Sequence, residues 1–385
     1  MDRSWVVLLV AALIVLSFVG WTAINPRYEV DYSNLIPPAV DTRIRTPSGP
    51  PEPATATPIS NPWKLEWKVF DVFADYGGVM QLSANNTGQN AIYIYGAGLG
   101  WTETGLSYDR DTWTEVGPGT RQYIGLLPFG APTEAGTYHY DLRIKVAVRS
   151  ASEELWYDKG MIELEGGEAV VHAVQPKGDW ATVENPTDLY NKVNERTIYS
   201  ATDSVVQEIR SEYPGSYSIL QIASAYEWVR DHIEYRAEQD GEDHWQYSNE
   251  TLSLGYGDCE DQAIFLASMI CGLGGFARVN EIVGHVFPTV YLTSNESMLP
   301  SYWEALDYYY GVRNQSLVFN FLEDEHGFWL VADTAGCPYL GGLTASSAYA
   351  EQVDGKTQWT FSSTTYLYSI DATGKTKGGG FLGLF

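Results

Sequence analysis

The sequence predicts an α+β protein in which an antiparallel β-sandwich precedes a region of helices and strands. Three observations predict this class. Residues 63–166 hold short runs of β-branched and aromatic residues separated by Gly, Asn, Asp and Pro, a pattern typical of strands and turns. After residue 187, apolar positions recur at steps of three and four, as in amphipathic helices. Further strand-like runs follow these helices, and this segregated order is typical of α+β folds.

An uncharged apolar segment, residues 5–24, has Trp5 and Trp21 near its ends. At a rise of 1.5 Å per residue its 20 positions cover about 30 Å, the thickness of a bilayer hydrocarbon core, and tryptophan prefers membrane interfaces. A cleaved signal peptide is the alternative, but the run is longer than a usual signal core and no A-x-A site follows it. We therefore expect a single-pass transmembrane anchor.

The segment that follows, residues 25–62, is expected to be a stalk. It has no convincing periodicity, and eight prolines lie between Pro37 and Pro62. Proline favours the extended polyproline II conformation, so this segment would hold the folded regions away from the membrane as a semi-rigid spacer.

We expect the folded regions to be extracytoplasmic, although the flanks of the anchor hardly orient it. Arg3 on one side is matched by Arg27 on the other, so the positive-inside rule does not decide. Four Asn-x-Ser/Thr sequons are compatible with an exported chain: Asn85, Asn249, Asn295 and Asn314.

The clearest strand of the expected sandwich, Leu142–Val148, alternates apolar and mostly polar side chains, as one buried and one solvated face require. The stretch Pro132–Tyr140 before it resembles the approach to a late strand of immunoglobulin-like modules. Six or seven strands at this spacing are typical of an antiparallel sandwich. The other expected strands are Lys68–Phe73, Val79–Ala84, Ala91–Tyr95, Gln122–Leu127 and Lys159–Leu164.

The region after residue 187 is expected to begin with helices. Ile219–Ile233 carries an apolar stripe at helical spacing, and Cys259–Leu273 is a second helix that glycines at its end terminate. Asn191–Tyr213 is a weaker candidate that ends at Pro214-Gly215. The strands expected after these helices are Val279–Val283, Val286–Leu292, Ser316–Phe321 and Phe328–Ala332.

The charge and the cysteine count exclude two classes of protein. Lys and Arg total 23 against 49 Asp and Glu, so the formal charge is −26, which would repel a nucleic-acid backbone. Nucleic acid is therefore not an expected partner. Three cysteines are too few for a disulfide scaffold, and their odd number leaves at least one thiol unpaired in a monomer.

One cysteine lies where a reactive thiol is favoured. Cys259 follows the loop Gly255-Tyr256-Gly257-Asp258 and begins the expected helix. A helix N-terminus carries partial positive charge and free N–H groups, which lower a thiol pKa and can hold an oxyanion. His285 begins a strand-like run and Asp333 ends another. A thiol needs a base, and the imidazole needs a carboxylate to fix its tautomer, so these residues predict a Cys-His-Asp triad.

Other interpretations of these residues stay open. A free cysteine is commonly a small buried hydrophobe, a lone histidine is commonly a core residue, and Asp333 could cap the turn that follows it. Glu260 and Asp261 would oppose thiolate formation by like charge. A metal site is not expected, because neither C-x-x-C nor H-x-x-x-H occurs. No cofactor is expected either.

The three motifs together resemble the transglutaminase-like superfamily over roughly residues 190–340. Gly257–Asp261, Gly284–Phe287 and Trp329–Thr334 resemble its nucleophile helix, histidine strand and aspartate strand, and Tyr226–Asp231 resembles the helix before the cysteine. The resemblance implies a papain-like catalytic core, placed here at residues 187–345, with Cys259, His285 and Asp333 as catalytic residues. Residues 346–385 would form a C-terminal extension.

The sequence departs from the family pattern in two places. Pro288 lies inside the histidine strand, and Thr293–Gly327 reads as an insertion that either overhangs the cleft or forms a solvated loop. A Cys271–Cys337 disulfide is one arrangement that would leave Cys259 free in an oxidising compartment.

The resemblance implies thiol-mediated acyl transfer on a protein or peptide substrate. We expect a membrane-anchored, extracytoplasmic cysteine hydrolase or acyltransferase that acts on peptide or isopeptide amide bonds. The alternative is a non-catalytic cell-surface binding or structural protein that uses the same scaffold.

Overall fold

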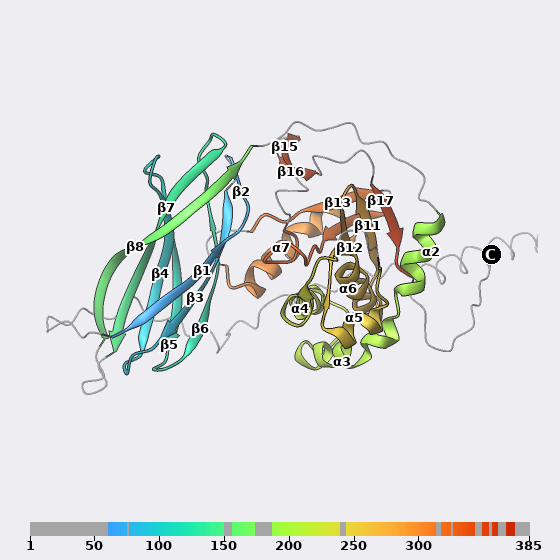
Figure 1. Cartoon of the computed structure of the whole chain (residues 1–385), viewed down its shortest axis with the longest axis horizontal. Coiled ribbons are helices and arrows are strands. Elements are labelled where there is room, and N and C mark those ends of the chain that lie inside the picture. The colour runs from blue at the N-terminus through green and yellow to red at the C-terminus, as the bar shows by residue number, and fades with distance from the viewer. Residues whose placement is uncertain are drawn as a thin grey trace, which may run out of the picture.

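The computed structural model describes residues 61–74, 77–149, 156–173, 187–238, 244–312, 317–324, 326–342, 349–353, 356–360 and 367–373. The expected anchor, residues 5–24, and the expected stalk up to residue 60 lie outside the described residues. Among the helices in the described part, none combines the length and apolar character needed to cross a bilayer. The chain is a mixed α+β protein, with a β-rich region followed along the long axis by an α+β region (Figure 1).

The β-rich region consists of two sheets that share a core (Figure 1). In both sheets all strand pairs are antiparallel except β2 with β8. Met80 and Leu82 of the smaller sheet pack with Leu99 and Leu142 of the larger one in a single buried cluster. The smaller sheet has the order β1 (Trp63–Val69), β3 (Gly78–Asn86), β6 (Arg121–Phe129). The larger has the order β2 (Val72–Phe73), β8 (Trp156–His172), β7 (Gly136–Arg149), β4 (Ile92–Trp101), β5 (Ser107–Val116).

Three strands differ from those expected. The strand Lys68–Phe73 was wrong as one element, because the chain leaves the smaller sheet after Val69 and enters the larger one at Val72. Strand β5 was not expected, since its sequence SYDRDTWTEV is polar and it lies at a sheet edge. Strand β8 continues to His172, past the residue 166 at which the sandwich was expected to end.

The α+β region is built on one five-stranded sheet and a buried helix. The helix, α6 (Cys259–Leu273), has the predicted bounds, and twelve of its fifteen residues are buried. It packs against α4 (Ile219–His232) and the central strands of the sheet. The sheet has the order β13 (Phe321–Asp324), β14 (Gly327–Val331), β12 (His285–Thr293), β11 (Ala277–Ile282), β17 (Tyr368–Asp371).

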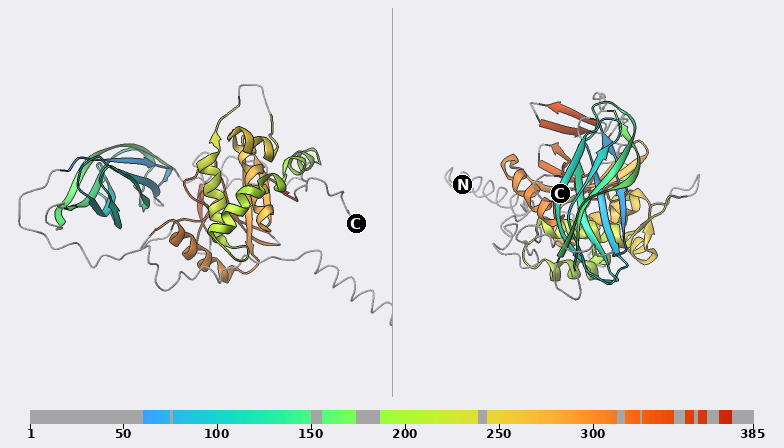
Figure 2. Two further views of the ribbon diagram at one scale, coloured as in Figure 1. Left: turned by 90° about the horizontal axis from the view of Figure 1, so that it is seen from below. Right: turned by 90° about the vertical axis from the view of Figure 1, so that its left-hand side faces the viewer.

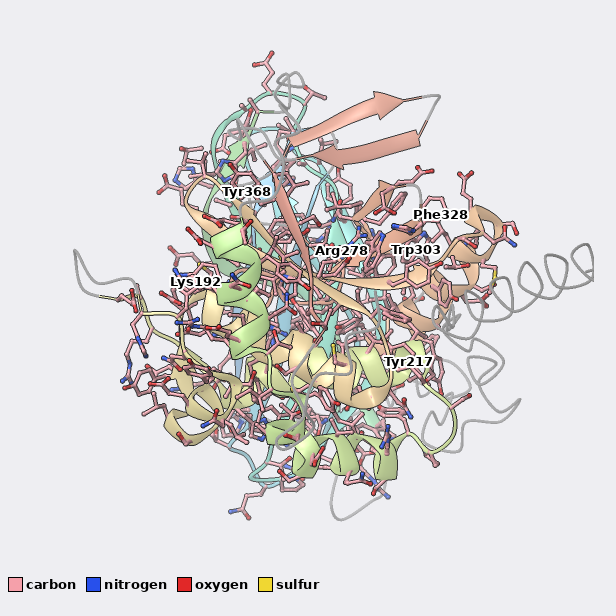
Figure 3. The ribbon with its side chains drawn as sticks, turned by 90° about the vertical axis from the view of Figure 1, so that its right-hand side faces the viewer. Lys192, Tyr217, Arg278, Trp303, Phe328 and Tyr368 are labelled. Atoms are coloured by element: carbon pink, nitrogen blue, oxygen red, sulfur yellow. The ribbon has the colours of Figure 1, made fainter. Side chains whose placement is uncertain are left out.

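Arg278 of β11 connects several strands of this sheet. Its guanidinium lies over the Trp329 ring, 3.6 Å from the ring centroid, and forms ion pairs with Asp324 and Asp371. In the view of Figure 3 it lies between Tyr368 of β17 and Phe328 of β14. Strand β17 comes from the segment expected to be a C-terminal extension, yet it forms an edge of this sheet.

Three further expectations are corrected or refined here. The weak helix Asn191–Tyr213 is broken, because residues 197 and 198 are not helical and a 3₁₀ turn intervenes. The strand Ser316–Phe321 was wrong, since among its described residues, 317–321, only Phe321 is in a strand. The insertion contains helix α7 (Leu299–Tyr309), whose Leu299, Tyr302 and Leu306 join the core, so it is neither wholly a loop nor wholly solvated.

The remaining elements are α2 (Thr187–Arg196), η2 (Tyr199–Thr202), α3 (Asp203–Glu212), β9 (Glu234–Tyr235), α5 (Ser248–Leu254), β10 (Tyr256–Gly257), η3 (Glu296–Met298), β15 (Tyr349–Val353) and β16 (Lys356–Thr360).

The two regions lie side by side in two views and touch each other (Figures 1 and 2). Val79 of β3 and Leu126 of β6 belong to the hydrophobic core cluster of the α+β region. The β-rich region therefore packs directly on the α+β region.

Candidate active site

Cys259 is the first residue of α6 and is half-buried. The loop before it is held by Asp261, whose carboxylate accepts the backbone N–H of Gln246 at 2.7 Å and that of Asp258 at 3.3 Å. The first N–H groups of a helix have no partner within the helix. The sulfur therefore lies at a helix end, next to a loop that the Asp261 carboxylate holds in place.

His285 and Asp333 are joined by a hydrogen bond. His285 begins β12, and Asp333 lies two residues after the end of the neighbouring strand β14. Because the two strands are antiparallel, both residues lie at the same end of the sheet. Nε2 of His285 lies 2.8 Å from Oδ2 of Asp333. The other oxygen of Asp333 accepts the N–H of Ala335 at 3.1 Å, so Asp333 both contacts the imidazole and caps the following turn.

The sulfur of Cys259 lies beside the strand that carries His285. The backbone N–H of Val286 donates to this sulfur and tends to lower its pKa. The thiol itself donates to Oε2 of Glu260 at 3.1 Å. The structure thus brings all three predicted residues to one end of the sheet, while the thiol hydrogen bond goes to Glu260 instead of His285.

Burial and charge set the protonation of these groups. Burial raises the pKa of the Cys259 thiol strongly, and the Glu260 carboxylate adds to the effect, so the thiol is protonated at neutral pH. Burial by itself lowers the pKa of His285, but the Asp333 carboxylate outweighs it and the net shift is upward. The Glu260 carboxylate therefore opposes ionisation of the Cys259 thiol, as the sequence predicted.

One group of side chains in the described ranges has donors suited to a cation. Carboxylate oxygens of Glu238, Asp258 and Glu260 lie within 4.8 Å of one another, and hard cations prefer such oxygens. Burial raises the pKa values of Asp258 and Glu260, so a proton can also relieve their repulsion. The expectation that the chain needs no metal or cofactor stays a prediction.

Glu260→Gln is expected to increase the reactivity of Cys259. Removing this carboxylate removes a cause of the raised thiol pKa, and one pKa unit corresponds to a tenfold change in thiolate fraction. The rate of Cys259 alkylation by iodoacetamide at pH 7.5, followed by peptide mass spectrometry, should rise roughly 3–10-fold. Glu238→Gln in the same carboxylate group is the control with a smaller effect, and an unchanged rate in Glu260→Gln would refute this electrostatic account.

A cavity of about 180 Å³ lies next to the site. We call it the β1 cleft, because Lys68 at the end of β1 and Phe70 form one wall. Gln262, one turn after Cys259, and Thr334, next to Asp333, also line it. None of the three predicted catalytic residues lines the β1 cleft itself, and none lines a larger cavity of about 260 Å³ between the two regions.

Tyr226 is a functional candidate that the sequence did not single out. It is fully buried on α4, and its hydroxyl donates to the carbonyls of Asp333 at 2.8 Å and Cys337 at 3.1 Å. It therefore fixes the backbone that carries the aspartate. The sequence analysis placed it in an apolar helical stripe and in the segment that resembles the helix before the cysteine, but gave it no role. A tyrosine in such a stripe is the signal that its hydroxyl needs a buried partner.

Two aromatic residues before Cys259, Trp245 and Tyr256, each contact a cationic side chain. Trp245 is buried beneath the ammonium of Lys192, 3.9 Å from the ring centroid, and its carbonyl accepts from Arg196. Tyr256 lies under the guanidinium of Arg236.

All three cysteines are free, so the Cys271–Cys337 disulfide is wrong. Cys271 lies at the far end of α6 and its thiol contacts the carbonyl of Ala372. Cys337 is buried in the turn after Asp333 and lines the β1 cleft. The two side chains pack against different elements, and Cys259 needs no such bridge to stay unpaired.

Comparisons with known proteins give only distant matches. No family model matches the chain, and no curated protein matches it. Among solved structures, a "putative cysteine protease from Cytophaga hutchinsonii" matches at 10% identity over 84% of this chain and 96% of that chain, with a TM-score of 0.24. A "putative protease from Parabacteroides distasonis" matches at 11% identity over 78% and 67%, with a TM-score of 0.23. The PapD-like domain 7 of human CEP192 matches at 10% identity over 32% and 96%, with a TM-score of 0.19.

Proposed function

We propose that this chain is a transglutaminase-like cysteine hydrolase or acyltransferase that acts on peptide or isopeptide amide bonds. Cys259 is the nucleophile, His285 the base and Asp333 the carboxylate that orients the imidazole. The observation that carries the proposal is the hydrogen bond between His285 Nε2 and Asp333 Oδ2. It occupies Nε2 and thereby leaves Nδ1, the second ring nitrogen, to accept the thiol proton.

The proposed reaction conserves atoms and charge in two steps. Nδ1 of His285 takes the proton of Cys259 while the sulfur attacks the amide carbonyl, and the backbone N–H of Cys259 donates to the developing oxyanion. The C–N bond then breaks, the amine leaves with the proton from His285, and a thioester remains. Water or a second amine attacks the thioester, gives a proton to His285, and the thiol returns.

The thiol has to leave Glu260 before this reaction begins. Its present hydrogen bond gives the thiol proton to Glu260 and not to His285. A rotation about the Cα–Cβ bond of Cys259 moves the sulfur without moving the helix, since χ1 has three staggered positions. We therefore include this rotation, driven by substrate binding, as the first step.

Water is the acceptor that we favour, because it is present at any exposed site, whereas a crosslinking enzyme needs a dedicated amine site.

The proposal also includes a membrane anchor at residues 5–24 and an extracytoplasmic location, supported by the length and apolar character of that segment. The expected partners are a protein or peptide substrate and the membrane. Nucleic acid is not a proposed partner, given the charge of −26.

A non-catalytic scaffold is the second candidate, and one observation favours it. The Cys259 thiol is hydrogen-bonded to a carboxylate and its pKa is raised, and both make a resting thiol inert. In that case the same fold would serve as a binding or structural module at the cell surface.

Labelling with a peptide that carries an acyloxymethyl ketone separates the two candidates. This group alkylates a thiol most readily when a neighbouring imidazole assists, so we expect the full-length wild type to be labelled at Cys259, as read by peptide mass spectrometry. Cys271→Ala should be labelled at the same rate, and His285→Ala at least 100-fold more slowly, within the usual range of base catalysis. If the folded wild type is not labelled, the scaffold is the correct interpretation.

A further inference from the structure

The β1 cleft is shared by the two regions of the chain. Lys68 and Phe70 come from the β-rich region, whereas Gln262 and Thr334 come from the α+β region. The β-rich region therefore contributes side chains to the space beside the proposed catalytic residues. Both regions therefore shape this cleft.

The cleft lies close enough to the sulfur to hold the neighbouring residue of a bound peptide. Gln262 is three positions after Cys259 on α6, and side chains at this spacing lie roughly 5–6 Å apart at Cβ. Burial raises the pKa of Tyr235, another lining residue, and the nearby groups Cys259, Asp258, Glu260 and Asp333 add to the shift in that order. The β1 cleft is therefore within reach of a side chain next to an amide that is bound at Cys259.

The charged residues that line the β1 cleft differ in how they are paired. Arg230 pairs with Glu227 at 2.9 Å, and Glu234 pairs with Arg236 at 3.2 Å. The ammonium of Lys68 lies over the Phe70 ring, 4.5 Å from its centroid, and no carboxylate within the described ranges forms an ion pair with it. The uncompensated charge in the cleft is therefore the positive charge of Lys68.

This charge stands out against the rest of the molecule. The chain carries 49 acidic and 23 basic residues, so its overall field repels anions. At physiological ionic strength that field is screened beyond roughly 8 Å, whereas a direct contact with Lys68 is not. A carboxylate bound in the β1 cleft would be the missing counter-ion of Lys68, whose ammonium contacts the Phe70 ring in the lining of the same cleft.

We propose that Lys68 makes the enzyme selective for acidic peptides, in which a Glu or Asp side chain lies one or two residues from the amide that Cys259 attacks. This inference rests on the proposed function and names its substrate class. Lys68 is a specificity-determining residue in a region that takes no part in the chemistry. Its removal changes the preference between substrates and leaves the reaction itself intact.

Paired probes test this preference. Two acyloxymethyl ketone peptides are identical except for Glu or Gln two residues before the reactive group, and the second-order rate of Cys259 labelling is measured at 0.15 M salt. We expect wild type to react about 5–20-fold faster with the Glu probe, the range of a charge-assisted contact. Lys68→Gln should bring the ratio close to one, and Lys68→Glu should reverse it.

Lys64→Gln is the matched control. Lys64 lies on the same strand and the same face as Lys68, four residues earlier and opposite Asn85, and it does not line the cleft. The Glu-to-Gln ratio should stay at the wild-type value in this variant. Thermal unfolding checks that all variants are folded.

The outcomes separate this inference from the proposed function. If neither probe labels folded wild type, the proposed function itself is wrong, and the inference fails with it. If both probes label Cys259 at equal rates, or if the ratio is the same in wild type and Lys68→Gln, only the preference for acidic peptides is overturned.

Discussion

Asp333→Asn is expected to lower kcat/KM for amide cleavage on the order of 10³-fold while the fold is retained. The carboxylate holds the Nε2–H tautomer of His285 and stabilises the imidazolium that forms when the thiol gives up its proton. An amide can also present N–H groups to Nε2, which turns the ring to the tautomer that cannot accept from the thiol. Labelling of Cys259 by the peptide probe and cleavage of a fluorogenic peptide measure the loss.

The pH dependence of stability gives a second readout for this variant. The pKa of His285 is raised in the folded protein, so its stabilising contribution is fully present below the ordinary histidine pKa of about 6.5 and is lost as pH rises through the folded value. The difference in free energy of unfolding between wild type and Asp333→Asn should therefore be larger at pH 6 than at pH 9. Glu208→Gln, at an exposed position on α3, is the control without such a trend. Full activity in Asp333→Asn would contradict the role assigned to this carboxylate.

Gly327→Ala is expected to lower the free energy of unfolding by about 2–4 kcal/mol. Gly327 has φ of 128°, and an added Cβ would lie 2.2 Å from the carbonyl oxygen of Thr293 on β12. The backbone has to move, and Gly327 begins the strand that leads to Asp333. Denaturant unfolding measures the loss, and the activity should fall with it because His285 and Asp333 lie on the two displaced strands.

Gly284→Ala is the matched control for this substitution. Gly284 also has a positive φ, of 74°, but an added Cβ meets no atom within 4 Å. Only the backbone preference is lost, which costs about 1–2 kcal/mol. Equal losses in the two variants would show that the close contact with Thr293 contributes nothing.

The sequence predicted the elements whose signal is local. Helix α6 was predicted with its observed bounds, because its apolar spacing and terminal glycines lie within the helix itself. Strand β5 was missed, since a polar edge strand is defined by its neighbour β4 and not by its own composition. Strand β17 was also missed, because its partner β11 lies far away in the sequence.

In the candidate site, too, some features were visible in the sequence and others depend on tertiary structure. The order of Cys259, His285 and Asp333 at element ends was visible in the sequence, and in the structure the last two are joined by a hydrogen bond of 2.8 Å. The bond from the thiol to Glu260 depends on a side-chain rotamer, which sequence patterns do not specify. The contribution of Lys68 depends on how two regions pack, and no local pattern carries that information.

The pairing of β17 with β11 has a consequence for how the chain matures. Residues 283–367 separate the two strands, so a ribosome finishes the rest of the sheet before the partner of β11 exists. Until then the β11 backbone is an open edge, which other extended chains can join. A C-terminal truncation that removes Tyr368 and all later residues would leave the β11 edge open permanently. It would also leave Arg278 without its Asp371 partner. We expect such shortened chains to self-associate during production even though every residue of the proposed active site is present.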